Sequence, residues 1–425
     1  MRRAAILGLL VGLSACGRAC KEAAAVADAG EAENEVDDAA MTTEELAAER
    51  CTLQGTPLEL VQERNVEVGR AQVMADGTIL VGLLRNGEAA IATLRTSKDE
   101  VTFAKVDPLG PVVGDAPPPE VLLAGKSSYA LYYARDAADA GRTARRLRFV
   151  RLGPAGAILD LPPESIDESM AFDGAFSGDD DALLAWDDLE GDHGVVRIVA
   201  VRHGALGEAR TYASSGGDAT GPHVLSAPDG YWLVWSAKKV DLLADGAPRQ
   251  PPEHALEGPG ELRSVDWIDA LKVDRDGHAI GGVVHVTPTD GHVGVFEASS
   301  LGADAFDVFA RDAAKGSQLT HVSMRGGKPG PSVVLPGPTM ALGLPLLFPW
   351  KNDWLLYADL ADRTMLVPLN SQDRVATGAA SWERGFDDGE VLSVLPGEDS
   401  EFVTLQMENL PAGRGPLLRV ARCRK

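Results

Sequence analysis

Two groups of aspartates are the residues best suited, by type and spacing, to bind a metal ion. Asp274 and Asp276 belong to the pattern D-x-D-G, which begins a calcium loop, but the later carboxylates and the bidentate glutamate of a complete loop are missing. Asp179, Asp180 and Asp181 place three carboxylates side by side, and such neighbours raise one another's pKa unless water or a metal ion solvates them. We expect both groups to form turns, with a calcium ion at either one as the alternative.

The sequence contains none of the common catalytic or cofactor-binding patterns. It lacks an HExxH pattern, a P-loop, a G-x-S-x-G nucleophile elbow and a CxxC pair. Three of the eight histidines, His278, His285 and His292, are seven residues apart, but this spacing does not require their imidazoles to converge as metal ligands must. The sequence therefore predicts no catalytic residue, no cofactor and no metal site.

The most basic stretch of this acidic chain lies within residues 311–342. It contains four positively charged residues, namely Arg311, Lys315, Arg325 and Lys328. Two short apolar runs, THVSM and PSVVL, flank the turn sequence RGGKPG and predict an extra hairpin. Insertions on one face of a repeat protein often contribute binding residues, so these four are our candidate binding residues. A loop without a binding role is the alternative.

Residues 1–16 have the organisation of an export signal. Arg2 and Arg3 precede the apolar stretch AAILGLLVGL, which is too short to span a bilayer. The next four residues, LSAC from Leu13 to Cys16, resemble the lipobox of bacterial lipoproteins. This resemblance implies cleavage before Cys16, attachment of lipid to its thiol, and anchoring by the acyl chains. An ordinary secretory signal and a buried N-terminal helix are the alternatives.

Residues 17–50 are predicted to form a mobile, acidic and alanine-rich tether. The segment has few residues to bury, so it cannot offset the entropy lost on ordering. A capping-box pattern from Thr42 to Glu45 predicts one short helix just before Cys51. Gly17 follows the lipid site, where lipoproteins of the enteric inner membrane have Asp. The resemblance therefore implies an exported, lipid-anchored protein of the outer membrane.

Cys51 and Cys423 bracket the repeat region of this exported chain. Because disulfides persist outside the cytoplasm, we expect these two residues to pair. In the chain-entropy model, closing so long a loop would contribute roughly 4–5 kcal/mol at most. Two separate buried thiols are the alternative. Cys20 is left over in the tether, either as a free thiol or as a second modification site.

A turn followed by a buried strand recurs along the chain. In its clearest copy, DGYWLVWS from Asp229 to Ser236, Asp-Gly supplies the turn and the aromatic and branched run supplies the strand. With Trp235 as the marker, the equivalent residues are Gly82, Tyr133, Trp186, Gly282, Tyr357 and Leu405. Five of the six gaps are close to 50 residues, and the gap after Gly282 is 75. Four strands in about 50 residues match a β-propeller blade.

The two ends of the repeat region complete one further period. The stretch from Cys51 to Gly82 and the stretch from Leu405 to Cys423 together equal about one repeat, as a closed ring requires. The sequence therefore predicts an all-β propeller over 51–425 with seven four-stranded blades, the last one combining three C-terminal strands with TLQGTPLEL near the N-terminus. The long gap places an insertion at 311–342. Two β-sandwich domains, or six or eight blades, are the alternatives.

These features favour a lipid-anchored binding or scaffold protein of the cell envelope, with a protein partner and no evident catalysis. The formal net charge of −23 disfavours nucleic acid as a partner. An envelope enzyme on the same fold, such as a hydrolase, a lyase or a quinone-dependent dehydrogenase, would need His, Arg and acidic side chains that converge at one mouth of the channel. A carbohydrate or cell-wall binder would expose Trp or Tyr in a groove. The fold alone does not decide between them.

Overall fold

The computed structural model describes residues 47–59, 66–97, 100–112, 116–135, 145–153, 156–162, 171–178, 181–240, 264–302, 304–313, 318–335, 345–350, 353–359, 363–369, 379–383, 389–395, 401–408 and 417–424. The chain divides into two units, Met1–Ala40 and Met41–Lys425, and all described residues belong to the second unit. The predicted signal peptide, Cys16, Cys20 and most of the tether lie outside the described residues. Within the described ranges, no helix is long and apolar enough to cross a membrane.

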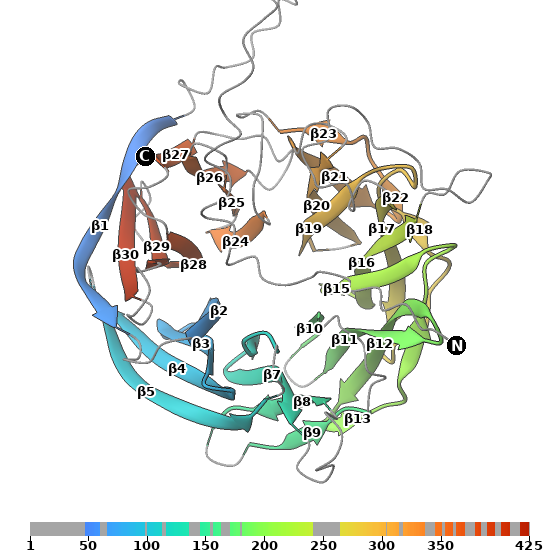
Figure 1. Ribbon diagram of the computed structural model, residues 1–425, viewed down its shortest axis with the longest axis horizontal. Coiled ribbons are helices and arrows are strands. Elements are labelled where there is room, and N and C mark those ends of the chain that lie inside the picture. Colours follow the sequence, from blue (N-terminus) through green and yellow to red (C-terminus); the bar gives the residue numbers. More distant parts are fainter. Residues whose placement is uncertain are drawn as a thin grey trace, which may run out of the picture. The chain divides into compact units, whose positions relative to one another are not determined.

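The described strands of the second unit form five antiparallel sheets of four or five strands and one eight-stranded sheet, which strand β1 holds together (Figure 1). When the eight-stranded sheet is divided at β1, the unit has seven sheets, which are numbered in chain order. The first sheet contains β2 (Val66–Val73), β3 (Thr78–Arg85), β4 (Glu88–Ser97) and β5 (Glu100–Pro111). The second contains β6 (Glu120–Ala124), β7 (Ser127–Arg135), β8 (Arg145–Arg151) and β9 (Ile158–Asp160). The third contains β10 (Phe172–Phe176), β11 (Ala182–Glu190), β12 (His193–Arg202), β13 (Ala205–Leu206) and β14 (Arg210–Tyr212).

The remaining four sheets follow the same plan. The fourth contains β15 (Asp218–Ala227), β16 (Gly230–Val240), β17 (Ser264–Asp274) and β18 (Val284–His285). The fifth contains β19 (Val293–Ser300), β20 (Ala305–Asp312), β21 (Gln318–Arg325), β22 (Lys328–Pro329) and β23 (Val333–Val334). The sixth contains β24 (Leu346–Trp350), β25 (Asp353–Asp359), β26 (Arg363–Leu369) and β27 (Ala379–Glu383). The seventh contains β28 (Gly389–Leu395), β29 (Glu401–Glu408), β30 (Leu417–Arg424) and β1 (Ala47–Glu59).

The seven sheets close into a ring, so the predicted β-propeller is confirmed. The first strand of each sheet contacts the first strand of both neighbouring sheets, in the order β2, β6, β10, β15, β19, β24, β28 and back to β2. These strands lie nearest the centre of the ring (Figure 1). The seventh sheet is completed by β1, which pairs antiparallel with β30 as predicted from the chain ends. The third and fifth sheets each have a fifth strand. The one in the fifth sheet, β23, lies in the PSVVL run and pairs antiparallel with β21, which contains THVSM, so the hairpin predicted for these two runs is confirmed. The fifth strand of the third sheet, β14, was not predicted.

The end of the predicted tether belongs to the propeller. Residues Ala47 to Arg50 form the start of β1 and pair in parallel with β27 of the sixth sheet, so the short helix expected before Cys51 is absent over these residues. Pairing with the edge of β27 gives the backbone N–H and C=O groups of this segment hydrogen-bond partners. A single helical turn would leave most of these groups without partners. The strand β1 therefore links the sixth and seventh sheets.

The predicted position of Gly282 in its blade is wrong. Gly282 was expected on the second strand of a blade, but it lies just before β18, the last strand of the fourth sheet. The second strand of the fifth sheet is β20, so the extra length lies earlier, between β16 and β17. The described residues of 311–342 are consequently not an insertion. They form the end of β20 and the strands β21, β22 and β23 of the fifth blade.

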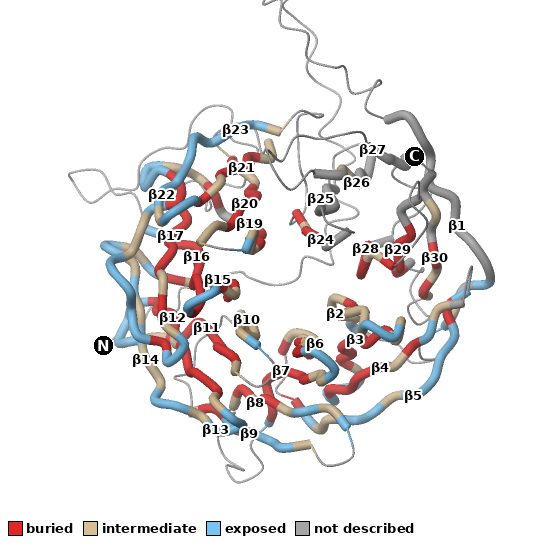
Figure 2. Tube along the Cα trace, turned by 180° about the vertical axis from the view of Figure 1, so that it is seen from behind, coloured by how far each residue is buried: buried red, intermediate tan, exposed pale blue. Residues whose placement is uncertain are grey.

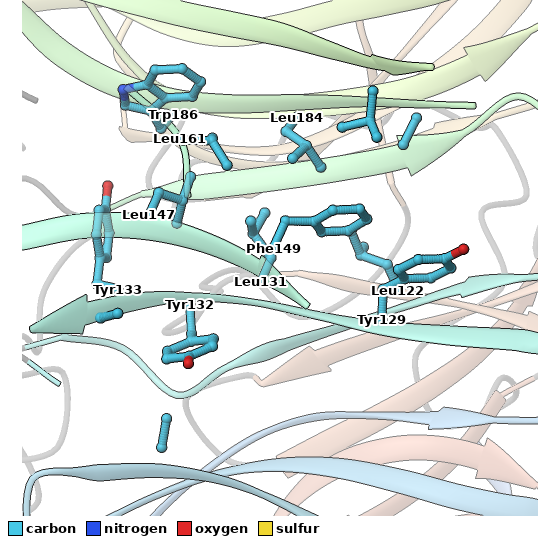
Figure 3. Close-up of a cluster of buried hydrophobic side chains, with 14 of the residues drawn as sticks. Leu122, Tyr129, Leu131, Tyr132, Tyr133, Leu147, Phe149, Leu161, Leu184 and Trp186 are labelled. Carbon is cyan, nitrogen blue, oxygen red and sulfur yellow. The ribbon is translucent and has the colours of Figure 1, made fainter. Parts of the chain in front are cut away.

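The hydrophobic core lies between neighbouring sheets. In the first five blades, buried residues concentrate in the middle strands, whereas outer strands such as β5 are largely exposed (Figure 2). Between the second and third sheets, Tyr129 stacks on Phe149 at 5.0 Å, and Trp186 is fully buried in the same cluster of side chains (Figure 3). Trp235 is fully buried between the third and fourth sheets. Both tryptophans therefore pack between blades as predicted, and each large buried side chain contributes on the order of 2–3 kcal/mol.

A glycine permits the closest approach between the first two blades. A Cβ atom at Gly82 would lie 1.8 Å from the carbonyl oxygen of Pro119, which directly precedes β6. Gly82 is the marker residue of the first repeat, where the third and fourth repeats have tryptophan. The residue at this position is therefore set by the distance to the next blade rather than by strand propensity.

Candidate functional site

A cavity of about 340 Å³ lies at the centre of the ring. It is lined by residues of six of the seven innermost strands, β2, β10, β15, β19, β24 and β28. Its wall combines aliphatic side chains with hydroxyl groups and one pair of charged residues, Arg70 and Glu297. Volumes of roughly 300–1,000 Å³ are typical of sites for small molecules.

Arg70 and Glu297 form an ion pair across the channel. Arg70 on β2 donates two hydrogen bonds to the Glu297 carboxylate on β19, at 3.2 and 3.0 Å. Glu297 is 7% exposed and Arg70 is 35% exposed. Burial alone would lower the pKa of Arg70, but the charge and hydrogen bonds of Glu297 raise it above its usual value. The Arg70 guanidinium also lies 5.6 Å from the centre of the Phe348 ring.

Asp173 is the centre of a second group of ionisable residues beside this pair. Its two carboxylate oxygens accept hydrogen bonds from the backbone N–H groups of Gly174 and Val224, both at 2.7 Å. The imidazole Nδ1 of His223 lies 3.7 Å from the same carboxylate. Burial raises the pKa of Asp173, and His223 together with the two backbone donors opposes that rise. The pKa of Asp173 is still raised overall, because burial outweighs these opposing effects.

Glu120 on β6 shares a hydrogen bond with Asp173. Burial and the negative charge of Asp173 raise the pKa of Glu120 well above its usual range, and this hydrogen bond raises it further. Two neighbouring carboxyl groups cannot both ionise at low cost, so Glu120 is the member that keeps the proton. The pair therefore combines a proton donor with a carboxylate.

The backbone of the inner strands is irregular next to the channel residues. The register of β2 shifts between Val68 and Ala71, beside Arg70, and that of β15 shifts between Thr220 and His223. Such bulges bend a strand and redirect the adjacent side chains, and they are common next to functional sites. The ring of His223 then contacts the ring of Phe296 at 4.8 Å, edge to face.

The aspartates considered for calcium are used in turns and ion pairs. Asp274 accepts hydrogen bonds from the backbone N–H groups of Asp276 and His278 at 2.9 and 2.8 Å, which is the turn role predicted for it. Arg202 lies 3.2 Å from Asp181 and 3.0 Å from Asp276. Asp179 and Asp180 lie outside the described residues. Among the described side chains, no group of three or more His, Cys, Asp or Glu is arranged to hold a metal ion.

The three evenly spaced histidines do not converge. His278 lies 2.7 Å from Arg210, whereas His285 contacts the fully buried Asp269 at 2.6 Å. His292 forms a backbone bridge with Asp266, next to the start of β19. Each histidine therefore has its own separate environment.

The candidate basic residues do not form one patch. Arg311 is opposite Leu319 on β21, whereas Arg325 is opposite Ala305 at the other end of the same hairpin. Six residues of strand separate these two ends, which corresponds to roughly 20 Å. Lys328 is opposite Arg325 on β22, and Lys315 lies outside the described residues. The site with converging side chains is therefore the channel, not this stretch.

Cys51 and Cys423 are direct neighbours in the closing sheet. The register of β1 and β30 pairs Cys51 with Cys423 and Thr52 with Arg422. Residues opposite one another in an antiparallel pair have Cα atoms about 4.5 or 5.5 Å apart, and disulfides span about 4.4–6.8 Å. The backbone arrangement is therefore compatible with the predicted disulfide.

The channel residues are absent from the site residues predicted above, although a regular spacing marks them. Arg70, Glu120, Asp173 and His223 each precede the marker residue of their own repeat by 12 or 13 positions. They occupy the innermost strand, one hairpin before the marker strand. Polar residues at a constant distance before the markers were the available signal.

Comparisons with known proteins found similar solved structures but no similar sequence. No protein-family model matches the chain, and no curated protein sequence matches it. The chain is similar to the solved structure of polysaccharide lyase Uly1, with a TM-score of 0.51 and 9% identity over 88% of this chain and 100% of that one. It is also similar to the β-propeller domain of the Trilobed protease from Pyrococcus furiosus, with a TM-score of 0.48 and 8% identity over 84% of this chain and 95% of that one. At such identities the likeness concerns the fold alone.

Proposed function

We propose that this chain is a lipid-anchored protein of the bacterial outer membrane whose propeller binds a small polar ligand in its central channel. The observation that supports the proposal is the convergence of Arg70 and Glu297, from the first and fifth blades, at a cavity of about 340 Å³. Removing two charged groups from water costs desolvation energy, and this ion pair is partly buried at Arg70 and buried at Glu297. A role in ligand binding is a reason for that cost that folding alone does not supply.

Ligand binding can be tested with the full-length protein in detergent. A panel of small molecules is screened by the shift in melting temperature, and the binding constants of those that stabilise the protein are measured by calorimetry. We expect Arg70→Met to abolish ligand-induced stabilisation. Arg148→Met is the matched control, because Arg148 also holds a carboxylate with two hydrogen bonds, to Asp160 at 2.6 and 3.1 Å, on the outer strands of the second blade. Equal effects of both substitutions would contradict a channel site.

Membrane attachment rests on the lipobox and is tested separately. We expect metabolically supplied palmitate to label the wild-type protein and the protein to sediment with the outer membrane. Cys16→Ala should abolish both labelling and sedimentation, because the acyl chains supply the membrane affinity. Cys20→Ala is the control, and a palmitate signal that depends on Cys20 instead of Cys16 would refute the assignment. A protein partner in the envelope stays a prediction.

Acid–base catalysis is the second candidate function. Glu120, Asp173 and His223 lie close to one another and near Arg70, and this convergence of acidic, imidazole and guanidinium groups supports the candidate. A proton donor beside a carboxylate can protonate a leaving group while the partner accepts a proton. Turnover of a model hydrolase or lyase substrate that is lost in Glu120→Gln would favour the enzyme. Binding without turnover would favour the binding protein.

A further inference from the structure

The walls of the channel cavity indicate which class of molecule it accepts. Two of the described residues that line it are charged, Arg70 and Glu297, and they neutralise each other through two hydrogen bonds. An anionic ligand at Arg70 would lie next to the Glu297 carboxylate, and a cationic ligand at Glu297 would lie next to the Arg70 guanidinium. Either ligand would therefore meet a charge of its own sign in a site where Glu297 is buried, which is costly. The wall therefore favours an uncharged ligand.

The same wall is rich in hydroxyl groups. Ser226, Ser299, Ser300 and Ser393 line the cavity together with the amide of Gln72. Ser300 donates its hydroxyl to the backbone carbonyl of Ser226 at 2.9 Å. Hydroxyl and amide groups both donate and accept hydrogen bonds, so they match the hydroxyl groups of a ligand without fixing its charge.

One of these hydroxyl groups lacks a partner. Ser299 is 5% exposed, and its Oγ has no hydrogen-bond partner among the described residues. Buried polar groups are normally paired, and this hydroxyl is enclosed beside the cavity, so rotation about the Cα–Cβ bond of Ser299 is what would bring it to a ligand or water molecule that completes it. On β19, Ser299 lies two positions after Glu297 and thus on the same face of the strand.

The rest of the wall is apolar. Val73, Val224, Leu347, Phe348 and Val394 line the cavity from four different blades. A molecule that carries both hydroxyl groups and C–H faces is complementary to such a surface, since the C–H faces bury apolar area while the hydroxyl groups pair with the serines.

We infer that the ligand of the channel is an uncharged, polyhydroxylated molecule, such as a neutral sugar unit or a cyclic polyol. The inference rests on the proposed ligand-binding function and specifies the ligand class. In this complex, Arg70 and Glu297 would form hydrogen bonds with the ligand as a pair, and Ser299 would donate a hydrogen bond to one ligand hydroxyl or accept one from it.

The test uses three pairs of probes, and the two members of each pair share the same ring but differ in charge. Calorimetry on the detergent-solubilised full-length protein compares N-acetylglucosamine, glucose and myo-inositol with glucosamine, glucuronate and inositol phosphate. At least one neutral probe should bind about tenfold or more tightly than its charged counterpart, because the charged group must be desolvated without a partner. Ser299→Ala should weaken that binding about 3- to 10-fold, the effect of one hydrogen bond. Ser332→Ala, at an exposed residue, is the control and should change nothing.

Ser299→Ala removes an unpaired hydroxyl, so it should not lower the melting temperature, and a loss of binding then reports on the ligand contact. If charged probes bind as well as the neutral ones and depend on Arg70, the channel is a ligand site but the inferred ligand class is wrong. If neutral probes bind and Ser299→Ala behaves like Ser332→Ala, the assigned contact is wrong. If no probe of any charge binds, both the inference and the proposed function are overturned.

Discussion

Replacing Cys51 by serine should weaken the attachment of the N-terminal strand of the propeller to its C-terminal strand. Cys51 is opposite Cys423 in the pairing of β1 with β30, and β1 is the strand that the N-terminal side contributes to the seventh sheet. A disulfide at this point would lock the ring, because opening it requires β1 to separate from β30. Without the covalent link, the ring is held there by strand pairing and by the packing of neighbouring sheets.

The size of the effect follows from the loop that the disulfide would close. About 370 residues lie between the two cysteines, and the chain-entropy model already gives about 4.7 kcal/mol for a loop of 100 residues. Disulfides usually contribute about 2–5 kcal/mol, which is the expected loss in free energy of unfolding. For a folded unit of roughly 380 residues this corresponds to a fall in melting temperature of about 2–6 °C.

The assay combines peptide mapping with thermal denaturation of the full-length protein in detergent. Non-reducing digestion of the wild type should yield the peptide of Cys51 linked to that of Cys423. Cys51→Ser, Cys423→Ser and the double variant should all melt at the same lower temperature, and a reductant should lower the melting temperature of the wild type only. If both thiols react with a labelling reagent in the oxidised protein, or if reductant changes the double variant equally, the reasoning is refuted.

Two further predictions concern the packing of blades and the ionisation of the channel. Gly82→Ala should destabilise the protein by about 1–3 kcal/mol in urea unfolding, since its Cβ would lie 1.8 Å from the Pro119 oxygen, whereas Gly282→Ala, with nothing within 4 Å, should be neutral. In the wild type, the raised pKa of Glu120 lets the folded state hold a proton that the unfolded chain releases above about pH 4.3. The wild type should therefore lose stability as the pH rises above that value. Glu120→Gln should remove this loss, because glutamine does not titrate. Melting curves of both proteins should converge at low pH and separate at high pH, and parallel curves would contradict this.

The fold could be predicted because each blade repeats the same local physics. Asp76-Gly77 and Asp229-Gly230 both form the turn between the first and second strands of a sheet, and an apolar run follows each turn. Asp276-Gly277 has the same composition but joins the third strand of the fourth sheet to its last strand. Every hairpin of a blade needs a turn of this kind, so turn composition alone cannot identify which hairpin it belongs to. The misassignment of Gly282 and the misplaced insertion both follow from this ambiguity.

The contacts of the channel site could not be predicted by the same means, because a polar residue 12 or 13 positions before each marker does not show which of these side chains meet. Arg70 and Glu297 are 227 positions apart and meet only once the ring has closed. Alternation along a strand predicts which side chains share a face, but a shift of one residue reverses that prediction. The inner strands β2, β15, β19 and β28 all contain such shifts, including the one beside Arg70. The register shifts beside Arg70 and His223 therefore limit what alternation along these strands can predict, because they change which side chains share a face.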